Sequence, residues 1–422
     1  MVTRALLRSA ALVALFALIA AFLAATAAAA EPSELVRPLS LRDALERADA
    51  HAPAVVRVMR GLGVARARRV GAGVVLPTNP RLSFEARPGF PVGAGAFGYA
   101  STLDFLFEVG GAPAAREVEA ERRTRVAARE LAVERLQARA DALVAYLRTS
   151  LAELRIAESN AVLAIGDRIH AASRLRAEAG ASGDIEESLA ETAVGELRAA
   201  VADALRQHEV HLSELRELLD LPATDALVLT TPLEEPNEVP PGDILVRRAL
   251  ASRPELDLIR ERVLALEATD RRLARETFPK VGAYLGVDAS PLSPMFVVAG
   301  VSIELPFAQR NQGPRAIAQA ERAGELSQLE LQGRRIARDV MAARAGYEAR
   351  RTQFKGITEQ ALPAAERTLE LVELGWRSGR FDLFRVTSAA RDVGRVRGLR
   401  VDALEAAWVE RVALERAVGG AL

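Results

Sequence analysis

The sequence of 422 residues contains no cysteine. Without cysteine the chain has no disulfide, no thiolate metal site and no thiol nucleophile. It also offers no N-terminal cysteine for lipid modification, so we expect a chain that is not lipid-anchored. Its stability and its chemistry must come from other residue types.

An excess of charge of either sign is also missing. The sequence has 56 lysine and arginine residues against 56 aspartate and glutamate residues. Nucleic-acid-binding proteins usually have a basic excess concentrated on one face. We therefore expect no nucleic-acid partner.

Long apolar runs are confined to the N-terminal region. Arg4 and Arg8 precede an uninterrupted apolar run from Ala10 to Leu23, and small residues follow before Glu31. This pattern predicts a secretory signal peptide over residues 1–30. An uncleaved membrane anchor is the alternative, although the run is shorter than the roughly 20 residues of a spanning helix.

A repeated stripe of small and apolar residues is the main feature of the sequence. Alternating steps of four and three give Leu136, Ala140, Leu143, Leu147, Ser150, Leu154, Ala157, Ala161 and Ala164. The same steps, 200 positions later, give Ile336, Val340, Ala343, Tyr347, Arg350, Phe354, Ile357, Ala361 and Ala364. We interpret the stripe as one long coiled-coil helix made twice by internal duplication. An ordinary dimeric coiled coil is the alternative.

Before each long helix, apolar and polar residues alternate strictly. This alternation predicts β-hairpins over 80–108 and 279–305. The expected lipid-facing residues are Leu82, Phe84, Leu103, Phe105, Phe107, Val281, Leu285, Val301, Ile303 and Leu305. Strands of about nine residues with one uncharged face are typical of outer-membrane barrels. A half-buried sheet in a soluble α+β domain would alternate in the same way.

The number of strands predicts the oligomeric state. Four strands cannot close a barrel, and unpaired strand edges are not tolerated in lipid. Two copies would give an eight-stranded barrel filled by its own side chains, whereas three copies would give a twelve-stranded barrel wide enough for water. If the strands lie in a membrane, we expect a homotrimer.

The sequence therefore predicts two structural repeats after the signal peptide. The first, 31–221, has a helix, the hairpin 80–108, a long helix 113–178 and a return helix 184–219. A proline-rich connector, 222–241, leads to the second repeat, 242–422, with a helix, the hairpin 279–305, a long helix 314–377 and a return helix 382–418.

Short motifs at the strand-to-helix junctions add a resemblance to a known family. They are Phe107-Glu108-Val109-Gly110-Gly111 after the first hairpin, Leu305-Pro306-Phe307 with Arg310-Asn311-Gln312-Gly313 after the second, and Arg253-Pro254-Glu255-Leu256. With the order of elements, they make the chain resemble the TolC-like outer-membrane efflux proteins, and the junctions are similar to those of the heavy-metal (CzcC/CusC-type) branch. The resemblance covers essentially the whole mature chain, but Ala52 to Val55 departs from the pattern.

The resemblance implies an α+β membrane protein in the outer membrane that extends into the periplasm of a Gram-negative cell. A trimer would join twelve transmembrane strands to an α-barrel of twelve helices. It would act as a passive duct, without cofactor or enzymatic activity, for heavy-metal cations or small drugs. The implied partners are a periplasmic adaptor protein and an inner-membrane pump of the RND or ABC type. The alternatives are a periplasmic coiled-coil scaffold or adaptor, or an exported metal-binding protein.

The candidate site residues lie at the two turns that end the long helices. Asp184 and Asp382, with Arg380, are candidates for a gate, since a threefold ring of carboxylates would attract cations. Each aspartate could instead only cap the helix that follows it. By resemblance, Gly180, Gly183 and Gly379 mark turns to which an adaptor would dock.

No catalytic fingerprint is present in the sequence. His208 and His211 are three positions apart, so on a helix they would share a face and could bind a metal ion. The spacing is not that of a metalloprotease motif, and no third ligand lies nearby in the sequence. A solvated helix surface is the alternative.

Overall fold

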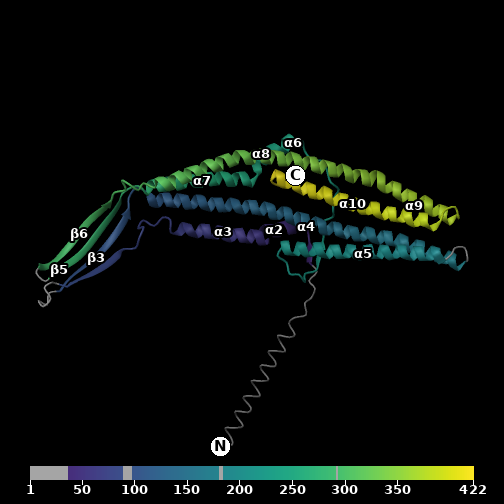
Figure 1. Cartoon of the computed structure of the whole chain (residues 1–422), viewed down its shortest axis with the longest axis horizontal. Helices are drawn as coiled ribbons and strands as arrows, with labels where there is room; N and C mark the ends of the chain where they lie inside the picture. The colour runs from purple at the N-terminus through teal and green to yellow at the C-terminus, as the bar shows by residue number, and fades with distance from the viewer. Residues whose placement is uncertain (1–36, 89–96, 180–183, 291–292) are drawn as a thin grey trace, which may run out of the picture.

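The computed structural model describes residues 37–88, 97–179, 184–290 and 293–422. The chain is strongly elongated, with a β-sheet at one end and long helices that run away from it toward the other end (Figure 1). The predicted signal peptide, 1–30, lies outside the described residues.

Two sets of elements follow one another in the same order. The first set is α2 (Leu41–His51), α3 (Pro53–Val70), β2 (Arg81–Pro88), β3 (Phe97–Glu108), α4 (Ala112–Glu178) and α5 (Asp184–Leu218). The second set is α6 (Gly242–Ser252), α7 (Pro254–Arg275), β5 (Lys280–Ser290), β6 (Ser293–Glu304), α8 (Gln312–Gly356), η1 (Ile357–Ala361), α9 (Leu362–Arg377) and α10 (Leu383–Val418). The starts of α4 and α8 are 200 positions apart, as the repeated stripe predicts.

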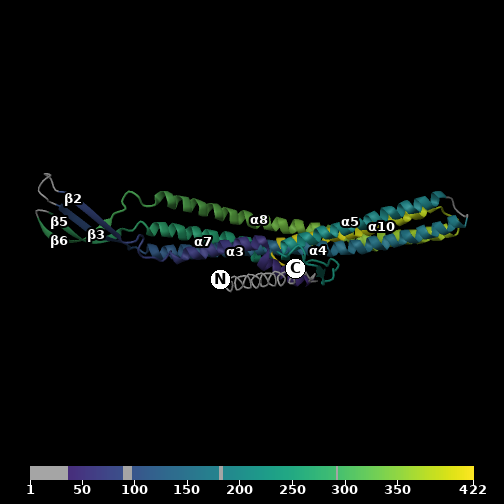
Figure 2. The ribbon, with the colours of Figure 1, turned by 90° about the horizontal axis from the view of Figure 1, so that it is seen from below.

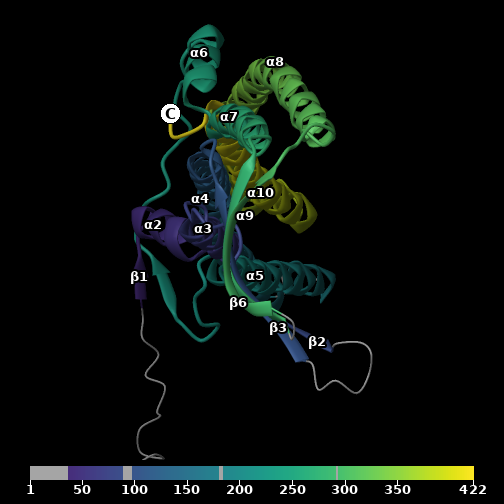
Figure 3. The same cartoon turned by 90° about the vertical axis from the view of Figure 1, so that its left-hand side faces the viewer.

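The two hairpins join into one antiparallel sheet with the order β2-β3-β5-β6. The central pair, β3 and β5, brings the two repeats together and sets Leu103 opposite Leu285. Among the described residues, β2 and β6 form the outer edges of this sheet. Figure 3 shows the sheet end-on as a narrow, bent ribbon projecting from the helices.

Helix α4 is the central element of the helical part. It has 67 residues, which at about 1.5 Å per residue correspond to a length of roughly 100 Å. It begins after Gly110 and Gly111, which have positive φ angles of 97° and 76° that a residue with a side chain rarely adopts. Helices α3, α5, α7 and α10 all pack against it (Figure 2). None of the described helices is long and apolar enough to cross a membrane.

The second long helix differs from the prediction of one uninterrupted helix over 314–377. A π-helical turn, η1, separates α8 from α9, and Leu362 N–H donates to Ile357 O, five residues back. The physical reason is Pro363, which lacks an N–H and whose ring would clash with the carbonyl four residues before it. Widening the helix by one residue per turn removes this clash. The prediction of a regular helix was wrong at this point.

A small parallel sheet holds the middle of the molecule together. It pairs β1 (Arg37–Leu39) with β4 (Leu227–Leu229) of the connector between the repeats. The buried Tyr146 of α4 donates a hydrogen bond from its hydroxyl to Leu39 O and accepts one from Thr231 N–H, both at 3.1 Å. One side chain thus ties both chain segments to the central helix.

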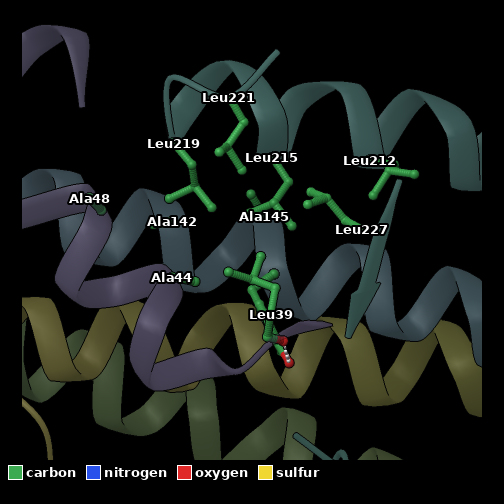
Figure 4. Packing of buried hydrophobic residues seen from close by; sticks show 11 residues of the cluster. Leu39, Ala44, Ala48, Ala142, Ala145, Leu212, Leu215, Leu219, Leu221 and Leu227 are labelled. Atoms are coloured by element: carbon green, nitrogen blue, oxygen red, sulfur yellow. Dashed lines mark hydrogen bonds between the residues drawn. The ribbon is translucent and has the colours of Figure 1, made fainter. Parts of the chain in front are cut away.

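Alanines allow close packing around this sheet. Ala44 and Ala48 of α2 and Ala142 and Ala145 of α4 are buried together. The leucines of α5 and of the two strands cover them (Figure 4). Because alanine side chains are small, the helix backbones approach closely while the leucines supply the apolar area.

The proline-rich connector continues as an exposed strap across the second repeat. Trp408 Nε1 donates to Glu234 O at 3.1 Å, and the Tyr347 hydroxyl donates to Asn237 O. Arg351 and Arg344 donate to Pro236 O and Pro240 O, each at 3.2 Å. Carbonyl groups that no sheet satisfies are therefore paired by side chains of the helices.

Ion pairs connect α4 to α10 along their length. Arg148 lies 3.3 Å from Glu405, Arg155 pairs with Asp402, and Glu158 accepts from Arg400 at 2.6 Å. Each pair links one repeat to the other, because α4 belongs to the first repeat and α10 to the second. These ion pairs, together with packing, hold α4 of the first repeat in register with α10 of the second.

A buried carboxylate joins α4 to α7 near the sheet. Glu119 is 6% exposed and accepts hydrogen bonds from Thr269, Arg123 and Arg272. Burial alone would raise the pKa of Glu119, but the Thr269 hydroxyl and the two guanidinium groups together hold it below its ordinary value. The carboxylate is therefore charged and fully paired at neutral pH.

We expect Tyr146→Phe to loosen the small parallel sheet of β1 and β4 and the connector next to it. The substitution leaves Leu39 O and Thr231 N–H without their partner, at a cost of about 1–3 kcal/mol for the buried groups. Amide hydrogen exchange should accelerate at residues 227–231. The matched variant Tyr347→Phe should act on residues 236–238 instead, and unchanged exchange in both variants would contradict this role of the tyrosines.

We expect Glu119→Gln to change the pH dependence of stability. A carboxyl with a depressed folded-state pKa stabilises the fold above its unfolded-state value of about 4.3, and this contribution is lost as the pH falls through the lower folded-state pKa. The variant should melt at a lower temperature than the native protein at neutral pH, and the difference should shrink in acid. Glu117→Gln, at an exposed neighbouring position, is the control; identical pH profiles for native and Glu119→Gln proteins would disprove the assignment.

Candidate functional site

The register of the sheet places nine of the ten predicted lipid-facing residues on one face. Residues directly opposite in antiparallel strands point to the same side, and the register sets Leu82 opposite Leu103 and Leu103 opposite Leu285. The others on this face of the ladder are Phe84, Phe105, Phe107, Val281, Val301 and Ile303. The tenth, Leu305, directly follows β6 and lies outside the ladder. This face, called the apolar face below, carries no charged side chain in the described strands.

The apolar face is left uncovered by the rest of the chain. Leu82, Phe84 and Val301 are 73%, 69% and 70% exposed. Phe84 stacks on Tyr99 and Phe105 on Phe107, with ring centroids about 6 Å apart, so the aromatic groups are ordered by their neighbours. A contiguous apolar surface of this kind requires an apolar environment outside the chain.

The opposite face of the sheet is polar. Arg81 lies opposite Asp104, and Arg87 pairs with both Glu85, at 3.0 Å, and Asp288, at 3.2 Å. Charged groups of this kind are stable in water, whereas the apolar residues that alternate with them along each strand are more stable away from water. The sheet therefore has one apolar face and one charged face.

At the other end of the molecule, the α9–α10 turn is closed by backbone hydrogen bonds. Arg380 N–H donates to Gly375 O at 2.8 Å and Gly379 N–H donates to Trp376 O at 3.0 Å, with Gly379 at φ +75°. This is the Schellman arrangement that ends many helices. The predicted turn residue Gly379 is thus needed for its positive φ, and the predicted gate residue Arg380 is exposed beside it.

Asp382 is placed as a helix cap. Its side chain is exposed and accepts a hydrogen bond from Arg385 N–H at 3.0 Å, in the extended conformation usual for a cap. Phe381 packs against Gly375, and the Arg385 guanidinium lies over the Phe381 ring. The capping alternative describes this residue in the single chain, and a gate role for it stays a prediction.

The corresponding turn of the first repeat is described only in part. Helix α5 begins at Asp184. The predicted turn residues Gly180 and Gly183 lie outside the described residues, as does the Asp184 side chain. Their predicted roles remain expectations.

Sequence reasoning missed a contact that joins the two hairpins at this end. Arg176, at the end of α4, donates to Trp376 O at 3.0 Å, and its guanidinium lies 5.2 Å from the centre of the Trp376 ring. Trp376 is 3% exposed within a cluster that also contains Ile169, Leu383 and Val386. The two partners are 200 positions apart, so the constant offset of the repeat was the available signal.

The two histidines on α5 are not brought to a third metal ligand. His208 lies 3.7 Å from Glu153 and His211 lies 3.2 Å from Glu214. Among the described residues, no group of three or more potential ligands could hold a metal ion. Each of the weak metal candidates therefore lies beside a glutamate side chain.

No family model matches the chain. The cobalt-zinc-cadmium resistance protein CzcC of Cupriavidus metallidurans is 24% identical to it over 328 residues, which cover 75% of this chain and 76% of that protein.

Solved structures of outer-membrane proteins match the whole architecture. CusC, reported with transmembrane channel formation, has a TM-score of 0.73 and 17% identity, covering 90% of this chain and 92% of its own. The outer-membrane channel OprN has a TM-score of 0.71 and 18% identity, covering 90% of each chain. The outer membrane protein VceC from Vibrio cholerae has a TM-score of 0.71 and 18% identity, covering 90% of this chain and 96% of its own.

Each of these solved structures matches 90% of this chain. The predicted fold class, duplicated long helices continuing a four-stranded sheet, is confirmed. The predicted resemblance to the TolC-like outer-membrane efflux proteins is confirmed as well, and this chain has the fold of these outer-membrane channels.

Proposed function

We propose that this chain is one subunit of a trimeric outer-membrane channel. The channel carries substrates passively through the outer membrane and the periplasm, and the chain acts as a wall of a duct and not as an enzyme. The observation that carries the proposal is the sheet with one apolar and one charged face at the end of helices roughly 100 Å long. A sheet in lipid, continued by helices in water, requires this distribution of residues.

The free surfaces of the single chain fit a trimer. The sheet edges at β2 and β6 would pair between neighbours, since edges cannot remain unpaired in lipid. In the lower half of the repeated stripe, Ala157, Ala161 and Ala164 of α4 are exposed, as are Ala361 and Ala364. Small residues at these positions allow neighbouring helices to approach closely.

The upper half of the stripe is used within the chain. Leu143 packs beside the buried Val412 of α10, and Ala343 packs in the cluster of Ile336 and Val340. The part of the stripe around Leu143 and Ala343 therefore makes contacts inside the chain. The part closer to the turns is exposed and available for contacts between chains.

Substrate and partners follow from the resemblance. The relative CzcC is a cobalt-zinc-cadmium resistance protein, which favours heavy-metal cations as the transported substrate over small drugs. A passive duct needs a pump, so we include a periplasmic adaptor and an inner-membrane pump of the RND or ABC type as partners. The adaptor would dock near Gly180, Gly183 and Gly379.

The narrow end of the duct would be formed by the two turns of each subunit. Asp184, Asp382 and Arg380 belong to these turns, and threefold repetition would gather their charges around one aperture. Asp382 can cap α10 and face an aperture at the same time, because capping uses one carboxylate oxygen, Oδ1. Cations would be attracted by the remaining charge.

We expect the two faces of β6 to respond differently to a charge. Val297 lies on the apolar face opposite Val287, and its neighbour Val298 lies on the polar face opposite Gly286. Val297→Arg should cost about 2–4 kcal/mol in lipid and deplete heat-modifiable trimers from the outer-membrane fraction. Val298→Arg, the matched control, should leave them in place; equal tolerance of both variants would argue against a membrane location of the sheet.

We expect charge at the turns to set ion preference. Asp382→Asn keeps a capping oxygen but removes the charge, so single-channel recordings should show reduced cation preference with unchanged thermal stability. Asp382→Ala removes both and should also lose the cap, worth about 1 kcal/mol. Asp184→Asn is the equivalent variant in the first repeat. Unchanged ion preference in both Asn variants would leave the aspartates as caps alone.

A further inference from the structure

Helices α3, α4, α7 and α8 form a curved wall next to the sheet. Helix α4 packs against α3 and α7, and α7 also packs against α8. Viewed from the sheet, the four helices follow one another in an arc (Figure 3). A trough of about 1550 Å³ is lined by residues of all four helices. The two ends of the arc, α3 and α8, are called the rims below.

Charged side chains at the base of the trough are paired within the chain. Arg262 of α7 donates to Glu130 of α4 at 2.9 Å. The buried Glu119 of α4 accepts from Arg123 of its own helix and from Arg272 of α7. The charges between the two central helices are therefore balanced inside the chain.

The α3 rim is basic. Helix α3 has no acidic residue, and its five arginines are Arg57, Arg60, Arg66, Arg68 and Arg69. Among the described residues, the ion pair formed by this helix is that of Arg69 with Glu117 of α4, at 3.8 Å. Arg57 and Arg68 both line the trough and are exposed. The free charge of this rim is therefore positive.

The beginning of the α8 rim is acidic. It contains Glu321, Glu325 and Glu330, and the one arginine among them, Arg322, pairs with Glu267 of α7 at 2.6 Å. Glu321 and Glu330 are exposed. The two rims thus carry opposite charges that the chain itself does not join, because α4 and α7 lie between them.

Contacts between α3 and α4 fix the level of each α3 residue along the wall. Thr124 of α4 donates to Ala65 O of α3 at 3.3 Å, and farther from the sheet Leu131 of α4 is buried in one cluster with Leu62 of α3. The two helices therefore run in opposite directions. Arg57 is level with Leu131 to within about one helical turn.

The offset of the repeat transfers these levels to α8. Leu331 follows Leu131 by 200 positions and is 60% exposed, and Glu330 is its neighbour in the sequence. By the same transfer Arg68, which is nearer the sheet than Arg57, is level with Glu321. The basic and acidic side chains of the two rims therefore match in height.

We infer that the two rims recognise each other between neighbouring copies of this chain. Arg57 and Arg68 of one copy lie against Glu330 and Glu321 of the next copy. The inference rests on the proposed function, which supplies the further copies, and it adds the residues by which the copies are selected. Opposite charges at matching levels favour this occupant of the rim over an unrelated protein.

One sign of charge on each rim fixes the direction of assembly. A twofold contact would place α3 against α3 or α8 against α8 and would bring like charges together, which is unfavourable. A head-to-tail contact joins a basic rim to an acidic rim and leaves one free rim of each sign, so that copies add until a ring closes. The charges therefore favour a ring over a twofold dimer.

Introduced thiols can report the contact directly, because the native chain has no cysteine. Arg57→Cys combined with Glu330→Cys should give covalently joined trimers when membranes with the full-length protein are treated with a short bismaleimide. Arg57→Cys combined with Glu321→Cys joins different levels and should give several-fold less product. Arg57→Cys alone should give none.

Charge reversal tests recognition without a crosslinker. Arg68→Glu should lower the temperature at which trimers dissociate on gels, because it places like charges together three times in each trimer. Adding Glu321→Arg should restore that temperature. Arg68→Glu with Glu330→Arg, at different levels, is the matched control and should not restore it.

The outcomes separate this inference from the proposed function. Trimers that form but do not crosslink at the matched pair, or crosslink equally at both pairs, would overturn the rim contact and leave the channel in place. Crosslinking by Arg57→Cys alone would show a twofold contact and overturn the direction of assembly. A native protein that forms no trimers would overturn the proposed function itself.

Discussion

A strand edge cannot be left unpaired in lipid, because its N–H and C=O groups find no water there. In the proposed channel, this constraint would govern the architecture of the chain. The two repeats each supply one hairpin, and the β3–β5 pairing removes two of the four edges that separate hairpins would expose. In the proposed trimer, neighbouring copies would pair with the outer edges at β2 and β6. The number of helices around the axis of the proposed channel would then follow from the number of copies that close the sheet.

Side-chain alternation and the constant offset of the repeat made much of this fold predictable. Leu82, Leu103 and Leu285 were assigned to one face from their spacing alone, and the register brings them into one row. The long helices were predictable because alanine and the alternating steps continue over many turns. The equatorial sheet was harder, since β1 has three residues and is stabilised by Tyr146, which is more than a hundred positions away.

The candidate site was less predictable than the fold. A cap can be expected where an aspartate follows a turn glycine, and Asp382 occupies that position. The contact of Arg176 with Trp376 depends on the side-by-side packing of two hairpins, which no local pattern encodes. The π-helical turn did have a local signal in Pro363, but a proline in a long helix can produce a kink, a break or a wider turn. In this chain the outcome is a wider turn that packs against α10.

The single π-helical turn has a consequence for symmetry. Two similar hairpins in each of three subunits would suggest a ring of six equal contact surfaces at the narrow end. Among the described residues, however, η1 lies on the second hairpin and the corresponding part of α4 is regular. The six hairpins would therefore alternate between two shapes. A partner built from six identical chains would meet two kinds of surface in turn, so its own subunits would have to adopt two conformations or two modes of attachment.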